Sequence, residues 1–147
     1  MIELTKTQEE RAMRLHKEAI VVDTHCDTLM QFLKQPYRRP PARKLGERGE
    51  SGHLDLPRMV EGGVTCQTFA VYTGRRAIVP EAPLMATLMV DKFYTEIEAN
   101  DGIVAVTTHD EIVDAKKAEK TCGLLSLEGA EPLMGEIGAL RVYYRLG

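Results

Sequence analysis

Three ionisable side chains follow an apolar run near the start of the sequence. Residues 20–29 read IVVDTHCDTL, in which Asp23, His25 and Asp27 fall within five positions. Side chains on a β-strand alternate between two faces, so these three would share one face, while Cys26 would point the other way as a small packed thiol. The pattern His-x-Asp offers one nitrogen and one carboxylate to a divalent metal. Taken alone, this short pattern is weak, and a His and Asp that merely hydrogen-bond where a strand meets a loop explain it better.

A second acidic residue ends another apolar run. In GLLSLEGAEP, Glu128 closes the apolar stretch of a predicted strand, residues 123–129, and Gly129 follows it directly. Active sites of α/β enzymes lie at the carboxyl ends of parallel strands, where a carboxylate can bridge two cations. Glu128 alone could also be a solvated loop residue. Acids at two strand ends together with a histidine favour a metal site.

Apolar runs alternate with helical patterns along the chain. The predicted strands are residues 20–25, 64–73 and 123–129, and the first has the unbroken Ile and Val content of a strand buried on both faces of a parallel sheet. Helical spacing, prolines and glycines predict the helices, which are residues 7–18, 53–63, 83–99, about 109–119, and Pro132 to Gly147. The order indicates an α/β fold of parallel strands with crossover helices.

Local patterns mark where three of these helices begin. Thr7 with Glu10, and Thr108 with Glu111, are capping-box patterns in which a hydroxyl is followed three residues later by a carboxylate. Asp55 precedes Leu-Pro and is predicted to be a helix N-cap. A brief apolar run, IVAVT, leads into the capping box at Thr108.

Residues 35–52, QPYRRPPARKLGERGESG, break the regular pattern. They contain three prolines, three glycines and five Arg or Lys residues, which predicts a flexible, irregular loop. Because the loop directly follows the first strand, it would lie beside the proposed site as a lid. A solvated insertion is the alternative.

Composition and charge exclude several classes of protein. The 147 residues, 44% of them apolar, suit a single domain, residues 1–147, with an ordinary core. The 22 acidic and 19 basic residues form no long run of one sign, which argues against nucleic acid as a partner. No signal peptide or membrane-length apolar run is visible, and three widely spaced cysteines suit a reducing compartment. We therefore expect a cytoplasmic protein with no membrane partner.

Three ordered segments resemble a known family. IVVDTHCDTL, HLDLPRMVEGGVTCQTFAVYT, and LLSLEGAEPL with LRVYYRLG are similar to the N-terminal portion of the membrane (renal) dipeptidase family of zinc peptidases. The resemblance spans nearly the whole chain. It implies an amidohydrolase-type (β/α)8 barrel of the TIM type, incomplete in this chain, that hydrolyses dipeptides at a centre of two zinc ions.

The resemblance also implies roles for single residues. His25 and Asp27 would bind the first zinc, Glu128 would bridge both zincs, and Asp23 would orient the strand end or a ligand without binding metal. Two further histidine ligands, the acid for the leaving amine and the substrate contacts are expected beyond Gly147, so the chain alone is expected to be inactive. The other histidines lie outside the matching positions and are predicted to be ordinary polar residues: His16, His53 and His109.

Two other interpretations stay open. Other amidohydrolase-type enzymes, such as deaminases and cyclic amidases, usually begin with His-x-His on the first strand, which the sequence His25-Cys26-Asp27 does not match. A truncated product without catalytic activity would pack or associate without turning over a substrate. Uncovered edges of three parallel strands also predict self-association.

Overall fold

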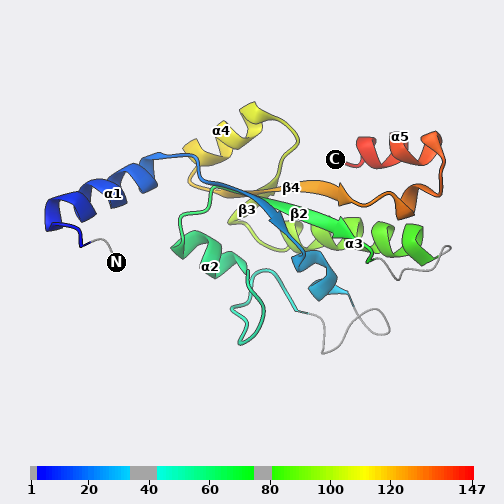
Figure 1. Ribbon diagram of the computed structural model, residues 1–147, viewed down its shortest axis with the longest axis horizontal. Helices are drawn as coiled ribbons and strands as arrows, with labels where there is room; N and C mark the ends of the chain where they lie inside the picture. The colour runs from blue at the N-terminus through cyan, green and yellow to red at the C-terminus, as the bar shows by residue number, and fades with distance from the viewer. Residues whose placement is uncertain (1–2, 34–42, 75–80) are drawn as a thin grey trace.

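Four parallel strands form the centre of the protein (Figure 1). The computed structural model describes residues 3–33, 43–74 and 81–147. The strands pair in the order β1-β2-β4-β3, and their bounds are Val22–Cys26 (β1), Cys66–Tyr72 (β2), Ile103–Ala105 (β3) and Thr121–Glu128 (β4). The predicted α/β arrangement of parallel strands joined by helices is confirmed.

Helices connect the strands and cover both faces of the sheet. The α-helices are Lys6–Glu18 (α1), Leu56–Glu61 (α2), Glu81–Glu98 (α3), His109–Lys117 (α4) and Ile137–Arg145 (α5), and the 3-10 helices are Thr28–Phe32 (η1) and Glu131–Leu133 (η2). Figure 1 shows α3 and α4 on opposite sides of the sheet. None of the described helices is long and apolar enough to cross a membrane.

The main core lies between β2 and α3. Phe69 of β2 packs edge-on against Phe93 of α3 with 5.7 Å between ring centroids. Gly123 of β4 permits this contact, because a Cβ at this position would lie 2.9 Å from the Phe93 ring. The buried side of α3 repeats at helical spacing, as its sequence predicts, through Ala82, Met85, Ala86, Met89, Val90, Phe93 and Ile97.

One strand of the sheet is not predicted from the sequence. β3 comes from the short IVAVT run and pairs with the beginning of β4, with Ile103 opposite Thr121 and Ala105 opposite Gly123. Three residues are too few to show a strand period. Because β3 lies outside β4, the three predicted strands are still adjacent, as β1, β2 and β4.

The prediction that the first strand is buried on both faces is wrong. Residues Val22 to His25 are exposed and only Cys26 is partly buried, whereas every residue of β2 except Tyr72 is buried. β1 lies at the edge of the described sheet, with β2 as its only strand neighbour there. The exposure of β1 therefore follows from its position at this edge, where no strand of the described sheet covers it.

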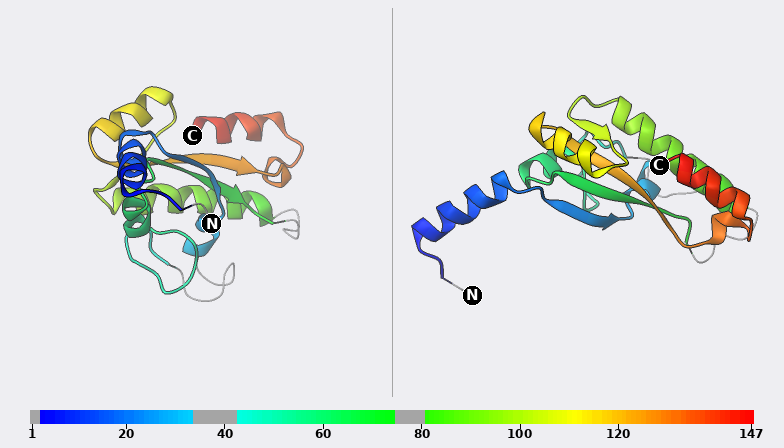
Figure 2. Two further views of the ribbon diagram at one scale, coloured as in Figure 1. Left: turned by 60° about the vertical axis from the view of Figure 1, so that its left-hand side comes forward. Right: turned by 90° about the horizontal axis from the view of Figure 1, so that it is seen from above.

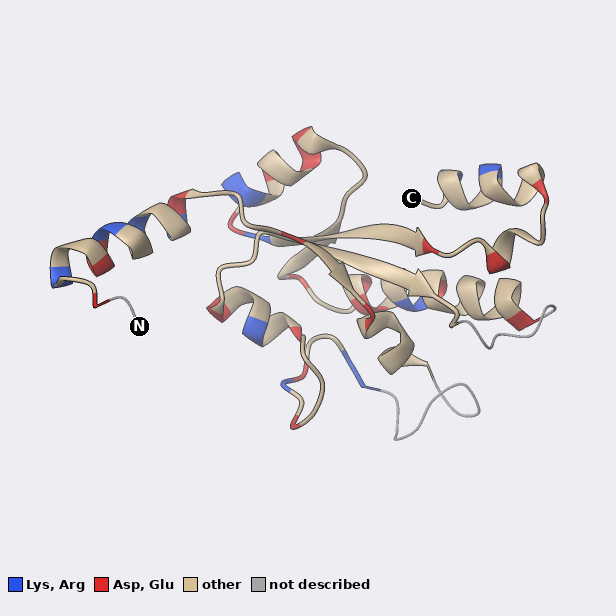
Figure 3. Cartoon of the chain, in the orientation of Figure 1, with Lys and Arg blue, Asp and Glu red and all other residues tan. Residues whose placement is uncertain are grey.

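The N-terminal helix begins two residues earlier than the predicted capping box. Thr5 is the N-cap and forms the reciprocal pair with Gln8, so the expected pairing of Thr7 with Glu10 is wrong. Thr5 with Gln8 and Thr7 with Glu10 both fit the capping-box motif, and the helix begins at the first of these pairs. No residue of α1 is buried, and the helix extends away from the sheet (Figure 2) with charges of both signs along it (Figure 3).

The other helix starts follow the predicted signals more closely. Asp55 caps α2, and Thr108 caps α4 with Glu111 completing the box. Backbone hydrogen bonds from Thr107 and Thr108 lower the pKa of Glu111. The last predicted helix is divided in two, because Pro132 lies in the short η2 and the chain then turns through left-handed residues before α5 begins at Ile137.

A buried carboxylate fixes the segment before α2. Asp55 has no exposed surface and accepts hydrogen bonds from the backbone N–H groups of Gly49 and Arg58 and from the side chains of Arg43 and Arg58. Residues 43–52 therefore form turns held to α2. The first part of the predicted loop, residues 35–42, lies outside the described residues.

Burial alone would raise the pKa of Asp55, but hydrogen bonds from the Arg58 side chain and from two backbone N–H groups outweigh it and lower the pKa from 3.8 to about 2. A carboxylate with a lowered pKa stabilises the fold above its unfolded pKa, and this contribution is lost as pH falls toward the folded value. The shift corresponds to about 2 kcal/mol of stability, lost between about pH 4 and pH 2.

We expect Asp55→Asn to lower the free energy of unfolding at pH 7 by about 3 kcal/mol, because it leaves two arginines beside a neutral buried group. Denaturant unfolding measures this. Glu61→Gln is the matched control, since Glu61 pairs with Arg48 on the surface and its loss should cost less than about 1 kcal/mol. Equal effects of the two substitutions would contradict the role assigned to Asp55.

Candidate metal centre

His25 lies near the carboxyl end of β1, and Asp27 follows the strand. The pairing of β1 with β2 shifts by one residue between Asp23 and Cys26, because these residues lie opposite Gln67 and Phe69. Such a bulge breaks the strict alternation that the sequence prediction assumed, and bulges commonly redirect side chains beside active sites. The bulge thus lies within the segment that carries His25.

The Asp27 carboxylate accepts no capping hydrogen bond from the backbone of η1. Asp27 is the N-cap residue of η1, yet its side chain makes no capping hydrogen bond. Its Oδ1 atom instead lies 3.4 Å from Nε2 of His25. Both carboxylate oxygens therefore stay available to a cation next to the imidazole.

Glu128 reaches the same place from the other side of β2. It is the last residue of β4 and lies opposite Tyr72 in the sheet, and Gly129 follows with a φ of 85°, which favours glycine. In Figure 3 the ribbon has the colour of acidic residues where β4 ends. Glu128 Oε2 lies 3.2 Å from His25 Nε2.

The three side chains form one compact group. One ligand atom each from His25, Asp27 and Glu128 lie within 4.8 Å of one another. Their side chains are 51%, 55% and 43% exposed, so the group opens to solvent. The structure thus brings together the three residues predicted as ligands, while metal binding by them stays a prediction.

One carboxylate oxygen of the group has no hydrogen-bond donor within the described part of the chain, and a bound cation would take that place. Glu128 Oε2 is shielded from solvent and accepts no hydrogen bond from the described residues, although His25 lies beside it. A shielded carboxylate oxygen without a partner costs free energy, and a bound cation removes that cost. One nitrogen and two carboxylates are also ligands that zinc accepts. The residues present therefore fit a divalent metal.

Asp23 acts on the backbone next to the group. Its Oδ1 atom accepts a hydrogen bond of 3.0 Å from the backbone N–H of His25. The contact fits the prediction that Asp23 orients a ligand without binding metal itself. Asp23 does not belong to the compact group of ligand atoms.

Gln67 is a supporting residue that the sequence prediction missed. It is fully buried in β2, and its side-chain amide donates to the carbonyl oxygens of Thr68, at 3.0 Å, and Asp23, at 3.4 Å. It thereby links β2 to β1 at the bulge. A glutamine, the one amide side chain in the strand segment VTCQTFAVYT, was the available signal.

The remaining histidines and Cys26 lie outside the group. His16 Nε2 contacts the carbonyl of Gly62 at 2.8 Å, and His109 pairs with Asp110 at 3.0 Å. Within the described ranges, no other cluster of His, Cys, Asp and Glu side chains has a geometry suited to a metal. Cys26 packs against the main core, and burial raises the pKa of its thiol.

The sequence matches the model of one protein family over nearly its whole length. The model of the membrane dipeptidase family, peptidase family M19, matches residues 9–147. The chain belongs to this family. A comparison with curated protein sequences found no match.

Solved structures of family M19 show the same fold. The dipeptidase AC, a metallopeptidase of the family, is 28% identical with a TM-score of 0.73. A metallopeptidase from Rhodobacter sphaeroides, liganded with a phosphinate mimic of the dipeptide L-Ala-D-Ala, is 26% identical with a TM-score of 0.71. The probable dipeptidase PvdM from Pseudomonas aeruginosa, at 14% identity and a TM-score of 0.80, supports the fold alone.

This chain corresponds to less than half of each of those proteins. It is covered over 87%, 87% and 98% of its length, but it spans 42%, 43% and 36% of the dipeptidase AC, the Rhodobacter protein and PvdM. These dipeptidases are of the TIM-barrel type. The predicted fold class, part of such a barrel, is therefore confirmed.

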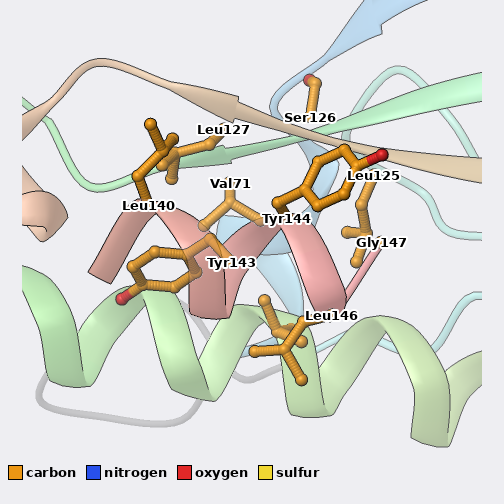
Figure 4. A pocket seen from close by; sticks show the side chains of 10 residues that line it. Val71, Leu125, Ser126, Leu127, Leu140, Tyr143, Tyr144, Leu146 and Gly147 are labelled. Atoms are coloured by element: carbon orange, nitrogen blue, oxygen red, sulfur yellow. The ribbon is translucent and has the colours of Figure 1, made fainter. Parts of the chain in front are cut away.

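An apolar pocket of the M19 chain lies apart from the metal-ligand group. It measures about 220 Å³ between β4, α3 and α5, and Figure 4 shows Leu140 and Tyr143 of α5 lining it together with Leu127 of β4. Nearby apolar side chains of α5, including Ile137 and Tyr144, are exposed. Self-association stays a prediction, for which this face supplies apolar surface.

The Asp23 contact predicts a specific effect on metal binding. Asp23→Ala should weaken zinc binding about 10-fold, because the His25 backbone loses the acceptor that orients it, whereas Asp23→Asn keeps an oxygen in place and should preserve most of the affinity. Zinc affinity measured by competition with a chromophoric chelator tests both variants. Equal losses in the two variants would show that charge matters and that backbone orientation does not.

Proposed function

We propose that this protein takes part in zinc-dependent hydrolysis of dipeptides. The observation that carries the proposal is the convergence of His25, Asp27 and Glu128 at the carboxyl ends of β1 and β4. Membership of family M19 favours this activity over that of a deaminase or cyclic amidase. We also propose that residues 1–147 form one domain; the expected cytoplasmic location stays a prediction.

Each of the three residues has a distinct part in holding metal. His25 would offer the lone pair of Nε2, the atom that faces both acids. Asp27 would bind on the same side from the start of η1, and Glu128, with two carboxylate oxygens, would bridge two ions. Bound zinc would polarise the peptide carbonyl and lower the pKa of a water molecule that attacks it.

The dipeptide substrate is proposed from a relative. The Rhodobacter protein, 26% identical to this chain, carries a mimic of L-Ala-D-Ala. The half-exposed side chains of the ligand group leave access for a molecule of that size.

Three ligand residues are few for two ions. A catalytic zinc usually has three protein ligands and one open position, and the described residues supply one nitrogen and two carboxylates in total. We therefore propose that full activity needs further ligands, which the resemblance to the family assigns to two histidines. With these three residues alone, zinc binding should be weak.

We expect His25→Ala to reduce zinc affinity by more than about 100-fold, because it removes the only nitrogen of the group and should exceed the effect of losing a supporting contact. Isothermal titration with zinc alone measures the change. His109→Ala is the matched control, since His109 also pairs with an aspartate but lies outside the group. A variant without His25 that binds zinc as tightly as the control would overturn the assignment.

Hydrolysis gives a separate test. Residues 1–147 alone should release no measurable amino acid from L-Ala-D-Ala in the presence of zinc, because the ions lack ligands. A longer form that also carries the two family histidines should hydrolyse the dipeptide, and Glu128→Gln should abolish this activity. Zinc-dependent turnover by residues 1–147 that Glu128→Gln removes would contradict the need for further ligands.

A further inference from the structure

Two cysteines that the metal-ligand group does not use lie side by side in the sheet. Cys66 of β2 is the register partner of Cys122 of β4. Register partners on adjacent strands point to the same face, so the two thiols are neighbours. Both side chains are fully buried, and neither forms a disulfide.

The thiols lie in a small apolar cluster on the face that α4 covers. Val106 and Ala115 complete its buried core. Cys122 Sγ donates to the carbonyl oxygen of Thr65 at 3.3 Å. No charged group belongs to this cluster, which makes it a poor site for a hard cation.

We propose that Cys66 and Cys122 are a modification site at which a peroxide forms an intramolecular disulfide between β2 and β4. Adjacent strands lie about 4.7–4.9 Å apart, which falls within the range of about 4.4–6.8 Å between the Cα atoms of disulfide-bonded cysteines. Register partners on neighbouring strands thus need little backbone movement to be joined. The site does not depend on metal.

The reaction is balanced with hydrogen peroxide as the oxidant. The Cys66 thiolate attacks one peroxide oxygen, the O–O bond breaks, and Cys66 becomes a sulfenic acid, while the departing hydroxide takes up the proton that the Cys66 thiol released and leaves as water. The Cys122 sulfur then attacks the Cys66 sulfur, the S–S bond forms and a second water leaves with the Cys122 proton. Both sulfur atoms are oxidised and the peroxide is reduced to two waters.

The order of the two steps follows from the hydrogen bond that the Cys122 thiol donates to the Thr65 carbonyl oxygen, because this bond favours the protonated form of Cys122. The neighbouring Cys122 thiol lowers the pKa of Cys66, against the effect of burial, whereas the neighbouring Cys66 thiol and burial raise the pKa of Cys122. The thiolate is the reactive form of cysteine. Cys66 is therefore the attacking residue and Cys122 the resolving residue.

A pocket gives a small oxidant a route toward the buried pair. A cavity of about 360 Å³ opens at the start of β2 and β4, and its lining includes Thr65 and Thr121. These residues directly precede the two cysteines in the sequence. An oxidant of the size of hydrogen peroxide therefore needs only a local opening at the strand starts.

The three cysteines can be followed separately in the wild-type chain. Tryptic peptides 18–34, 59–75 and 121–141 contain Cys26, Cys66 and Cys122 respectively, one cysteine in each. We would treat the native chain with hydrogen peroxide and a chelator, block free thiols, and map the peptides without reduction. The expected product is a disulfide link between peptides 59–75 and 121–141, with a mass two hydrogen atoms below their sum. The protein then retains one free thiol, that of Cys26, and dithiothreitol restores all three.

Variants and unfolding provide the controls. Cys26→Ser should form the link as the wild type does, whereas Cys122→Ser should not, and oxidation in denaturant should also give links to Cys26. Disulfide links to Cys26 in the native chain would overturn the proposal. So would three free thiols in the native chain under conditions in which the same peroxide oxidises an unstructured cysteine peptide. The wild-type mapping decides the result even if a variant does not fold.

Discussion

The parallel register of β1, β2 and β4 is the constraint on which the site depends. β2 pairs with β4 without interruption from Cys66 to Tyr72, so Glu128 must end the sheet next to Tyr72. β1 pairs with the other edge of β2, and its bulge adds one residue before Cys26. Parallel strands end at a common edge, where a histidine from one strand and a carboxylate from another can meet across the strand between them. Two residues 103 positions apart in the sequence thus come within 3.2 Å.

Much of this arrangement could be predicted from local patterns. The apolar runs that became β2 and β4, the caps at Asp55 and Thr108, and the helical face of α3 are all properties of a few consecutive residues. Burial of the first strand could not be predicted, because an edge strand and a central strand share the same β-branched residues and differ only in their neighbours. β3 was missed because its three residues acquire strand geometry by pairing with β4.

The site shows the same division between local and long-range information. Spacing placed His25 and Asp27 near each other, and the position of Glu128 at the end of another predicted strand made it a third candidate, but no local pattern could show that their ligand atoms meet. The bulge and its support by Gln67 depend on β1 and β2 being in contact. The Asp27 carboxylate is free because it makes no capping hydrogen bond to η1, although Asp27 is the N-cap residue of that helix. The contact between β1 and β2 cannot be deduced from a single sequence, because neither segment indicates the strand with which it pairs.

The two chemistries that we propose lie at opposite ends of the same strand. β4 begins beside the buried thiol pair and ends at Glu128, and its register with β2 is continuous between them. Near the strand starts the thiols are buried in an apolar cluster with side chains of α4, whereas the strand ends carry half-exposed ionisable groups. In (β/α) barrels, residues at the first end act on stability and those at the second act on substrate. A disulfide between Cys66 and Cys122 would therefore tighten the strand pair that holds Glu128 without entering the metal-ligand group.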